Sequence, residues 1–514
     1  MTLLELQPLT LDLAVGAAAL VVLVFDLCFD LKRFAGHLSA VLLTAILVAS
    51  FYVDTSGTAA FDAYVGGEAA LYFKRLVLAL AIVGVLGGLQ HVGRHTPLRQ
   101  GEYYFLVLLS VLGMCLLPGA RDLILFIVCF ELMGMPLYVL SAFAKTDGAP
   151  ATAGRPAGSA SEAGIKFYLV GAASTALMLF GGSLLAGMAG GTSFAAIAAA
   201  PTTPLLLVGM LFVLAGMGFK LGVAPFHMWV PDTYQGSSTP FVAFLSAAPK
   251  VAGMSAAVLV LATALPAQQR VWAPALLVLC PVTLIVGSLL AMPQTNVKRL
   301  LAYSGVAHVG FMLMALAVGT PASVQMLLFY LLAYAFTNLG AFLVVHAVGS
   351  HAGDDSASSF DGLAQRSPWL ALALLIFMLS LAGIPFVAGF WAKLYVFMIV
   401  YQAGHVGLVA LAALISVLAL FYYLQLVKAA YIHAPPRPDR IRVSKSLGFA
   451  IVLCLASVVG IGLWPAPFLN AAGRAAAPLF EPAPLPAVRS ARKTPRLASL
   501  RSPHAAGPLH PLSR

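Results

Sequence analysis

The sequence predicts an all-α polytopic membrane protein with about 14 transmembrane helices, and two observations predict this class. Of the 514 residues, 61% are hydrophobic and only 9% are charged, whereas an average soluble domain has about 25% charged residues. The apolar residues also fall into runs of about 20, the length that crosses a hydrocarbon core about 30 Å thick. Because so much apolar surface cannot be buried in one globular core, a soluble enzyme, a disordered chain and a nucleic-acid-binding protein are excluded.

Runs of spanning length follow one another along the whole chain. They cover 10–30, 37–53, 72–93, 103–118, 121–144, 164–189, 204–225, 240–265, 272–292, 299–319, 322–349, 369–402, 405–432 and 446–469. The run at 369–402 is long but interrupted, so it is counted as one broken helix. No signal peptide is expected, because the first run has the length of a retained helix rather than of a cleaved leader.

The loop charges predict the orientation, because cytoplasmic connections of membrane proteins carry an excess of lysine and arginine. An even number of helices puts both termini on one side. Alternate connections, starting after the first helix, carry 13 cations, against four on the opposite side, namely Lys74, Arg75, Arg121 and Arg270. The first set is therefore assigned to the cytoplasm and the termini to the periplasm. The basic tail at 484–514 opposes this assignment, but charges beyond a final helix seldom overturn a topology.

Three segments are expected to lie outside the packed fold. Residues 146–164 and 350–367 are loops of small and polar residues, and residues 484–514 form a disordered basic tail rich in proline, serine and arginine. The five cysteines stand singly, without a C-x-x-C or Cys/His cluster. They are interpreted as small buried hydrophobes, because a disulfide framework, a zinc site and an iron–sulfur cluster all need grouped ligands.

Four charged residues lie deep inside apolar runs: Glu131, Lys220, Lys250 and Lys393. Each costs a few kcal/mol at the bilayer centre, so such residues usually line a wet cavity or pair with one another. Although the chain contains more arginines than lysines, every deep cation is a lysine. Arginine cannot lose its proton in a protein, whereas a buried lysine can. This choice favours a set of proton-exchanging groups over structural ion pairs.

Two helices carry matching interruptions. Gly222 and Pro225 follow Lys220 directly, and Gly383 and Pro385 precede Lys393. Proline removes a backbone hydrogen bond and clashes with the preceding turn, so each helix is expected to break there. Paired interruptions beside ionisable residues are typical of ion sites in transporters built from inverted repeats.

Four further residues are auxiliary candidates. His227 and His308 lie in apolar stretches, where a neutral hydrogen-bonded histidine is the ordinary interpretation and a proton relay is the alternative. Glu162 and Lys166 are four residues apart, a spacing that stabilises a helix start through an ion pair. The alternative for this pair is a place at the cytoplasmic mouth of a proton path.

These residues carry a resemblance to a known family. The chain resembles the antiporter-like membrane subunits of bacterial proton-pumping NADH:quinone oxidoreductase (respiratory complex I). The terminal lysine in FWAKLYVF and the compact C-terminus are similar to the subunit N branch. The stretches that match are FELMGMPLYVL, EAGIKFYLVGAASTALMLFG, GFKLGVAPFHMWVPDTYQGSSTP, FLSAAPKVAG, NVKRLLAYSGVAHVGF, FYLLAYAFTNLGAF and LAGIPFVAGFWAKLYVF.

The resemblance implies two inverted five-helix repeats, each with a broken helix. It places three N-terminal helices in 1–100, the repeats in 101–265 (helices 4–8) and 270–432 (helices 9–13), and the last helix in 440–475.

It also implies residue roles. Glu131 would be the helix-5 carboxylate that pairs with and modulates Lys220, the input-side carrier, while Lys250 would connect to the exit-side Lys393. His227 and His308 would bridge the central axis, and Glu162 and Lys166 match the helix-6 pair of the family.

As a family member, the chain would belong to an enzyme without doing redox chemistry itself. It has no dinucleotide-binding motif and no P-loop, so NADH, flavin, iron–sulfur clusters and quinone are expected in partner subunits. Its partners would be the other membrane-arm and peripheral-arm subunits and the bilayer of the bacterial inner membrane, with no nucleic acid. Three alternatives remain: a subunit of a multisubunit sodium/proton antiporter, a stand-alone solute carrier and a structural membrane scaffold.

Overall fold

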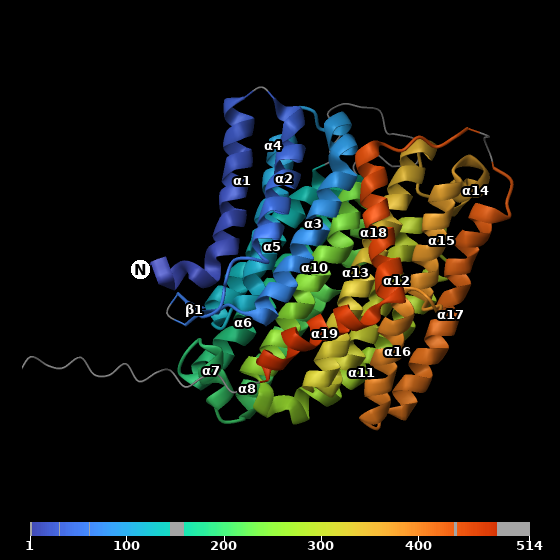
Figure 1. Cartoon of the computed structure of the whole chain (residues 1–514). Helices are drawn as coiled ribbons and strands as arrows, with labels where there is room; N and C mark the ends of the chain where they lie inside the picture. Colours follow the sequence, from blue (N-terminus) through green and yellow to red (C-terminus); the bar gives the residue numbers. More distant parts are fainter. Residues whose placement is uncertain (1–2, 30, 61, 144–158, 436–438, 481–514) are drawn as a thin grey trace, which may run out of the picture. The chain divides into compact units, whose positions relative to one another are not determined.

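The computed structural model describes residues 3–29, 31–60, 62–143, 159–435 and 439–480. The chain divides into two units, Met1–Phe480 and Glu481–Arg514. The second unit lies outside the described residues, and with it the predicted disordered tail at 484–514. The first unit is a bundle of long helices that run roughly parallel or antiparallel to one another (Figure 1).

The N-terminal part contains three long helices and a small hairpin that the sequence did not predict. Strands β1 and β2 pair antiparallel between the second and third helices. The elements are η1 (Leu3–Leu9), α1 (Thr10–Cys28), η2 (Lys32–Phe34), α2 (Ala35–Ala49), β1 (Thr58–Ala59), β2 (Tyr64–Val65) and α3 (Glu68–His95).

Two consecutive sets of helices follow. The first comprises α4 (Gln100–Leu116), η3 (Leu117–Gly119), α5 (Leu123–Ala142), α6 (Ser159–Ala189), α7 (Phe194–Ala199), α8 (Pro204–Leu221), α9 (Trp229–Gly236), α10 (Thr239–Leu259) and η4 (Val260–Ala264). The second comprises η5 (Pro266–Gln268), α11 (Gln269–Ala291), α12 (Val297–Val318), α13 (Pro321–Ala352), η6 (Ala357–Phe360), α14 (Leu363–Arg366), α15 (Pro368–Ala382), α16 (Ala388–Gln402) and α17 (Val406–Tyr431). The chain continues with α18 (Lys445–Leu463), α19 (Pro465–Ala476) and η7 (Ala477–Leu479).

Several helix starts follow ordinary capping chemistry. The side chain of Asp122 accepts a hydrogen bond from the backbone N–H of Ile124 (2.8 Å) at the start of α5. Thr320 and Ser323 form a reciprocal capping box at the start of α13. Such caps satisfy N–H groups that have no partner inside the helix, and proline at the first helical position has no N–H to satisfy. Proline occupies the first turn of α8, α10, α13, α15 and α19.

The number of membrane crossings agrees with the sequence. Thirteen helices of the described residues are long and apolar enough to span a bilayer. The run at 369–402, predicted to be one broken helix, forms α15 and α16, which together supply a fourteenth crossing. The prediction of about 14 transmembrane helices is therefore confirmed.

The two sets of helices are packed in the same way. In the first, α4 packs against α5 and α6 against α8; in the second, α11 packs against α12 and α13 against α15 and α16. Each set crosses the membrane five times, so the second begins on the opposite side from the first and the repeats are inverted. Helix α10 is buried along its whole length, and α12 and α13 are nearly as buried. These three helices form the core between the repeats.

Several predicted boundaries were wrong. Helix α6 begins at Ser159 rather than at 164, so part of the predicted loop at 146–164 is helical; residues 144–158 lie outside the described residues. The loop predicted at 350–367 contains the end of α13 and two short helices.

The last spanning helix also ends earlier than predicted. It stops at Leu463 instead of continuing to 469, because Pro465 cannot extend it and starts α19. Helix α19 packs across α13 and α3 (Figure 1). A hydrogen bond from the Gln325 Nε2 to the carbonyl of Leu469 (3.0 Å) fixes it there.

The position of Lys74 differs from the one assumed when the loop charges were counted. The sequence analysis counted it among connection cations, but it lies in α3 with only 1% of its side chain exposed. Its Nζ lies 2.6 Å from the Asp12 carboxylate of α1, which also accepts a hydrogen bond from the Tyr64 hydroxyl (3.1 Å). Lys74 is thus a further buried lysine, and unlike Lys220, Lys250 and Lys393 it is held in an ion pair.

Candidate functional site

Both predicted helix breaks occur at the glycine. Helix α8 ends at Leu221 and Gly222 has φ 77° and ψ 36°; helix α15 ends at Ala382 and Gly383 has φ 87° and ψ 35°. These left-handed conformations end a helix and favour glycine. Pro225 and Pro385 lie in the connections that follow, before α9 and α16. In both repeats, a glycine in the left-handed conformation therefore ends a helix at the corresponding position.

Carbonyl groups at the ends of the two broken helices accept hydrogen bonds from side-chain donors. The indole Nε1 of Trp229 donates to the carbonyl of Phe219 (2.9 Å). At the second break the carbonyl of Ala382 accepts hydrogen bonds from Lys393 Nζ (2.9 Å) and Ser416 Oγ (3.2 Å). Unsatisfied backbone groups are not tolerated inside a bilayer, so these contacts make the interruptions possible.

Lys220 lies in the last turn of α8, directly before the first break, with 4% exposure. Its Nζ lies 3.5 Å from the hydroxyl of Tyr138. It also lies over two aromatic rings, 5.1 Å from the centroid of Tyr138 and 5.2 Å from that of Phe130. A methyl group on Gly134 of α5 would lie 2.4 Å from this amine. The glycine therefore provides the space that the amine occupies.

Glu131 does not contact Lys220 directly. Its carboxylate accepts a hydrogen bond from the Thr175 hydroxyl of α6 (2.5 Å), and no ion pair joins it to Lys220 in the part of the chain that the structure describes. Glu131 lies on α5 and Lys220 on α8, two helices of the first repeat that both pack against α6. Any influence of Glu131 on Lys220 in this conformation acts through space rather than through a shared hydrogen bond.

Lys250 lies in the middle of α10, at the centre of the buried core. Its Nζ donates a hydrogen bond to the hydroxyl of Tyr334 on α13 (3.0 Å). A methyl group on Gly305 of α12 would lie 2.5 Å from the same amine. The stem of Lys220 approaches Gly253, which follows Lys250 by one turn of α10. The first two lysines thus lie on neighbouring surfaces of two packed helices.

His308 lies on α12 among hydroxyl groups of the second repeat. Its Nδ1 lies 2.7 Å from the Tyr330 hydroxyl and its Nε2 lies 3.3 Å from the Tyr423 hydroxyl. Tyr423 is also hydrogen-bonded to Ser304. The ring of His308 is 5.0 Å, between centroids, from that of Tyr334, which contacts Lys250. His308 therefore lies beside Tyr334, the hydrogen-bond partner of the central lysine.

Lys393 lies in the second turn of α16, the helix that follows the second break. Besides the carbonyl of Ala382, its Nζ donates to Ser416 of α17 (2.7 Å) and lies 4.9 Å from the centre of the Phe311 ring. Phe311 is three residues from His308 on α12, and the two rings are 6.0 Å apart between centroids. The amine binds at the C-terminal end of α15, where the helix dipole favours a cation.

Glu162 and Lys166 form the predicted ion pair (2.8 Å) at the start of α6. Lys166 also contacts Asp232 of α9 (3.0 Å), and Asp232 contacts Arg299 of α12 (2.7 Å). Together with Asp354 and Asp355 these residues line a polar cavity of about 280 Å³. The cavity joins elements of both repeats at one end of the bundle.

The cavity is anionic on the side of Asp354. Partial burial raises the pKa of this carboxyl, but hydrogen bonds from Ser359 and Ser356 outweigh that effect and hold the pKa below its usual range. The buried Lys298 contributes a further ion pair to Asp355 (3.1 Å).

His227 is placed apart from the others. It lies in the connection between α8 and α9, where its ring is 6.4 Å, between centroids, from that of Tyr303. Among the contacts of the described residues, none joins it to His308. The structure thus brings His308, but not His227, next to the lysines.

Sequence analysis missed the hydroxyl partners of the lysines. Tyr138, Tyr334 and Ser416 each contact one amine, and Tyr330 and Tyr423 contact His308. The only signal was the spacing of Tyr330 and Tyr334, four residues apart on one face of a helix. No group of three or more potential ligands is placed to hold a metal ion in the described residues. Of the five single cysteines, four are buried and Cys28 is exposed.

A membrane bundle with two inverted repeats, each broken beside a buried lysine, defines the class of antiporter-like membrane subunits. Residues 120–419 match the family described as "NADH:quinone oxidoreductase/Mrp antiporter, TM". The fold also resembles a chain of the Mrp complex from Dietzia sp. DQ12-45-1b, with a TM-score of 0.83 and 21% identity over 93% of this chain and 98% of that one.

Curated relatives define the family further. "NADH-quinone oxidoreductase subunit N" of Moorella thermoacetica is 37% identical over 93% of this chain and 99% of the relative. A chain of respiratory complex I from Thermus thermophilus superposes with a TM-score of 0.77, at 31% identity, over 90% of this chain and all of that one. The chain belongs to the NADH-quinone oxidoreductase subunit N family, and is therefore a membrane subunit of an oxidoreductase that acts as a translocase.

Proposed function

We propose that this chain translocates protons across the bacterial inner membrane, driven by quinone reduction in partner subunits of the membrane and peripheral arms. One observation carries the proposal. Lys220, Lys250 and Lys393 are each at most 5% exposed, and none of them forms an ion pair within the described residues. A lysine that is buried without a carboxylate can exist as a neutral amine, which arginine cannot.

The proton path begins at the polar cavity of Glu162 and Lys166 and reaches Lys220. Glu131 favours the protonated form of Lys220 through space, and movement of neighbouring subunits weakens that influence. The proton then passes to Lys250. Where no side chains meet, the transfer uses water molecules.

The second half of the path runs from Lys250 past His308 to Lys393. Tyr334, Tyr330 and Tyr423 supply hydroxyl groups beside His308, and the proton leaves from Lys393 to the periplasm. His227, in the connection that follows the first break, is an auxiliary group that assists proton transfer there. NADH, flavin, iron–sulfur clusters and quinone are bound by the partners, and this chain binds none of them.

The energies are of a suitable size. Moving one charge against a potential of 100 mV costs about 2.3 kcal/mol. A hydrogen bond to a charged group contributes about 1.5–3 kcal/mol. Making or breaking one such contact in each cycle therefore changes the proton affinity of a lysine by the amount that pumping requires.

Replacing Lys220 with arginine tests the path, because arginine retains the positive charge and lacks the exchangeable proton. In inverted vesicles that contain the intact complex, Lys220→Arg and Lys220→Ala should abolish or strongly reduce NADH-driven proton uptake while assembly is retained. Lys428→Arg is the matched control, because Lys428 is exposed in the last turn of α17.

Full proton uptake by Lys220→Arg would contradict the relay. The same vesicles distinguish a sodium/proton antiporter, for which proton movement would depend on a sodium gradient and not on NADH and quinone. Uptake that is independent of sodium and sensitive to Lys220 supports the proposal.

A further inference from the structure

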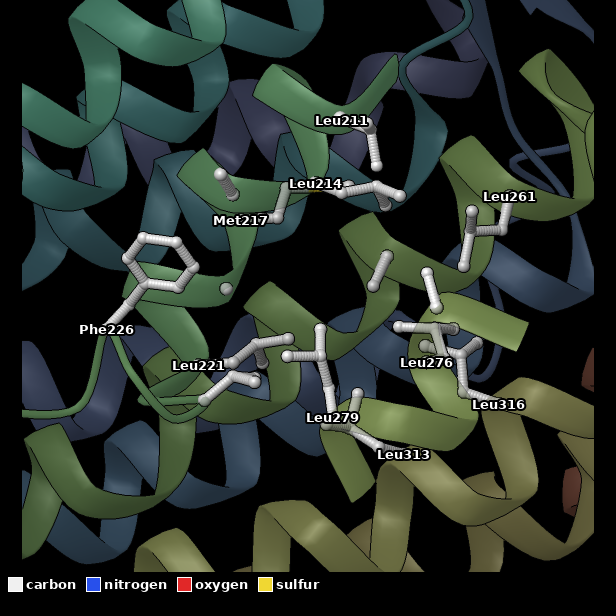
Figure 2. A pocket seen from close by; sticks show the side chains of 15 residues that line it. Leu211, Leu214, Met217, Leu221, Phe226, Leu261, Leu276, Leu279, Leu313 and Leu316 are labelled. Atoms are coloured by element: carbon white, nitrogen blue, oxygen red, sulfur yellow. The ribbon is translucent and has the colours of Figure 1, made fainter. Parts of the chain in front are cut away.

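An apolar cavity of about 200 Å³ lies between four helices, α8, α10, α11 and α12 (Figure 2). Fifteen residues line it, and all of them are apolar residues or glycine. They include Leu214 and Leu221 of α8, Leu276 and Leu279 of α11, and Leu313 of α12. In the close view these side chains point from separate helices toward one shared space (Figure 2). None of the residues assigned to the proton path lines this cavity.

The cavity lies at the boundary between the repeats. Helix α8 packs on α6 and α10, whereas α11 packs on α12 and α17. The cavity occupies the space between α8 and α11, and α10 and α12 supply the rest of its lining. One of its lining side chains, Leu211, is 50% exposed, so the cavity opens onto the outer face of the helices. Because these helices span the membrane, the open side of the cavity faces the hydrocarbon region.

The lining restricts what can fill the cavity. A buried water molecule needs two to four polar partners, and the lining side chains provide none. A transmembrane helix is about 10 Å in diameter and is too wide for a space of this volume. A dry apolar cavity of about 150 Å³ is known to bind benzene, so hydrocarbon of slightly larger size fits.

We propose that an acyl chain of a bilayer phospholipid occupies this cavity. Atoms that line a void lose the dispersion contacts that a close-packed neighbour provides. Acyl chains are present at very high concentration along the exposed face of α8 and α11, and they are narrow and flexible enough to enter between them. The site takes hydrocarbon alone, because the lining offers no group that would recognise a headgroup.

The bound chain would contact the end of α8 beside Lys220. Met217, Leu221 and Val223 line the cavity and flank Lys220 and the break at Gly222. A hydrocarbon chain packed there fills the space beside the end of α8. The site is independent of the proton relay, because it follows from the cavity and the membrane-spanning fold alone.

Photolabelling of the intact complex in vesicles tests this site. The probe is phosphatidylethanolamine with a diazirine in the middle of one acyl chain, mixed with ordinary lipid, and adducts are located by mass spectrometry of peptides. We expect severalfold more adduct on Leu214 and Leu276 than on Val417, which is 67% exposed on α17 and represents ordinary lipid contact. Ala275→Phe, which fills the cavity, should lower the cavity adducts severalfold.

Val278→Phe is the matched control, because it enlarges an outward residue of the same helix and should leave the cavity adducts unchanged. If Ala275→Phe prevents assembly, Ala257→Leu fills the same cavity from α10. The proposal is overturned if the cavity residues of the unmodified complex are labelled no more than Val417. It is also overturned if filling the cavity leaves the labelling unchanged, or if zero-length cross-linking places a partner side chain in the cavity.

Discussion

At the scale of single residues, each relay amine lies against a glycine of a neighbouring element. A methyl group would lie 2.4 Å from Lys220 Nζ at Gly134, 2.5 Å from Lys250 Nζ at Gly305, and 2.8 Å from Lys393 Cδ at Gly383. At Gly134 and Gly305 the nearest obstacle is a flexible lysine side chain, which can move aside, whereas Gly383 also has a φ of 87° that any side chain would strain. Gly134 and Gly305 therefore determine where the amines lie rather than whether the helices pack.

Gly134→Ala should displace the Lys220 amine while leaving the fold intact. We expect near-normal amounts of assembled complex and a proton uptake per NADH that falls severalfold, because the amine loses its place beside Tyr138. The measurement is proton uptake together with NADH oxidation in vesicles. Gly187→Ala in α6, where a methyl group would meet nothing within 4 Å, should behave as the unmodified chain. Unchanged pumping by Gly134→Ala would refute the positioning role.

Tyr334→Phe should impair the middle of the relay. It removes the hydroxyl that accepts a hydrogen bond from Lys250 Nζ (3.0 Å), and a buried donor left without a partner costs about 1–3 kcal/mol. We expect pumping to slow about tenfold, since 1.4 kcal/mol corresponds to a factor of ten. Tyr72→Phe, which removes a hydrogen bond to the carbonyl of Leu328 (2.9 Å) away from the lysines, is the control. Equal effects of the two changes would indicate a structural role only.

The residues that sequence analysis found and missed differ in how conspicuous they are. A lysine in an apolar run is conspicuous because burying a charge is expensive, so Lys220, Lys250 and Lys393 could be predicted. Tyrosine is common in membrane helices, and the chain has 16. Which of them contacts an amine depends on how helices distant in the sequence pack, and that is why Tyr138 and Tyr334 were missed.

At the scale of elements, the sequence predicted the two broken helices well. Gly222 and Gly383 act through local backbone geometry, which a sequence expresses directly. Helix α19 and the ion pair of Lys74 were not predicted, because each depends on a long-range contact. Lys74 lies near the start of α3, where a helix-end lysine ordinarily reaches water. Its burial follows from Asp12, which lies 62 positions away.

The Asp12–Lys74 pair should hold α1 against α3. Removing one partner of a buried ion pair costs about 3–5 kcal/mol, whereas replacing both with apolar residues is often nearly neutral. We therefore expect Lys74→Met to lower the thermal stability of the purified complex and the double variant with Asp12→Leu to restore most of it. Lys428→Met, at an exposed position, should have little effect. A double variant no more stable than Lys74→Met would show that the charges themselves are required.

At the scale of the whole molecule, contacts of charged side chains join the two repeats at one end. Arg299 at the start of α12 contacts Asp232 of α9 (2.7 Å), and the buried Lys298 donates to the carbonyl of Ser237 (3.0 Å). The sequence placed these two cations in a cytoplasmic connection, and that side assignment stays a prediction. They also connect the second repeat to the broken helix of the first. A movement at one break can therefore be transmitted to the other repeat across the polar cavity.

The predicted orientation puts this polar end in the cytoplasm. The native Cys28 lies exposed at the end of α1, next to the cationic connection of Lys32 and Arg33, and Ser56 is exposed in the connection between α2 and α3 at the other end of the bundle. A membrane-impermeant maleimide should therefore label Ser56→Cys, in a Cys28→Ser background, from the periplasmic side of spheroplasts. Cys28 itself should react in inverted vesicles only. The opposite pattern would reverse the orientation, and with it the direction in which Lys393 releases its proton.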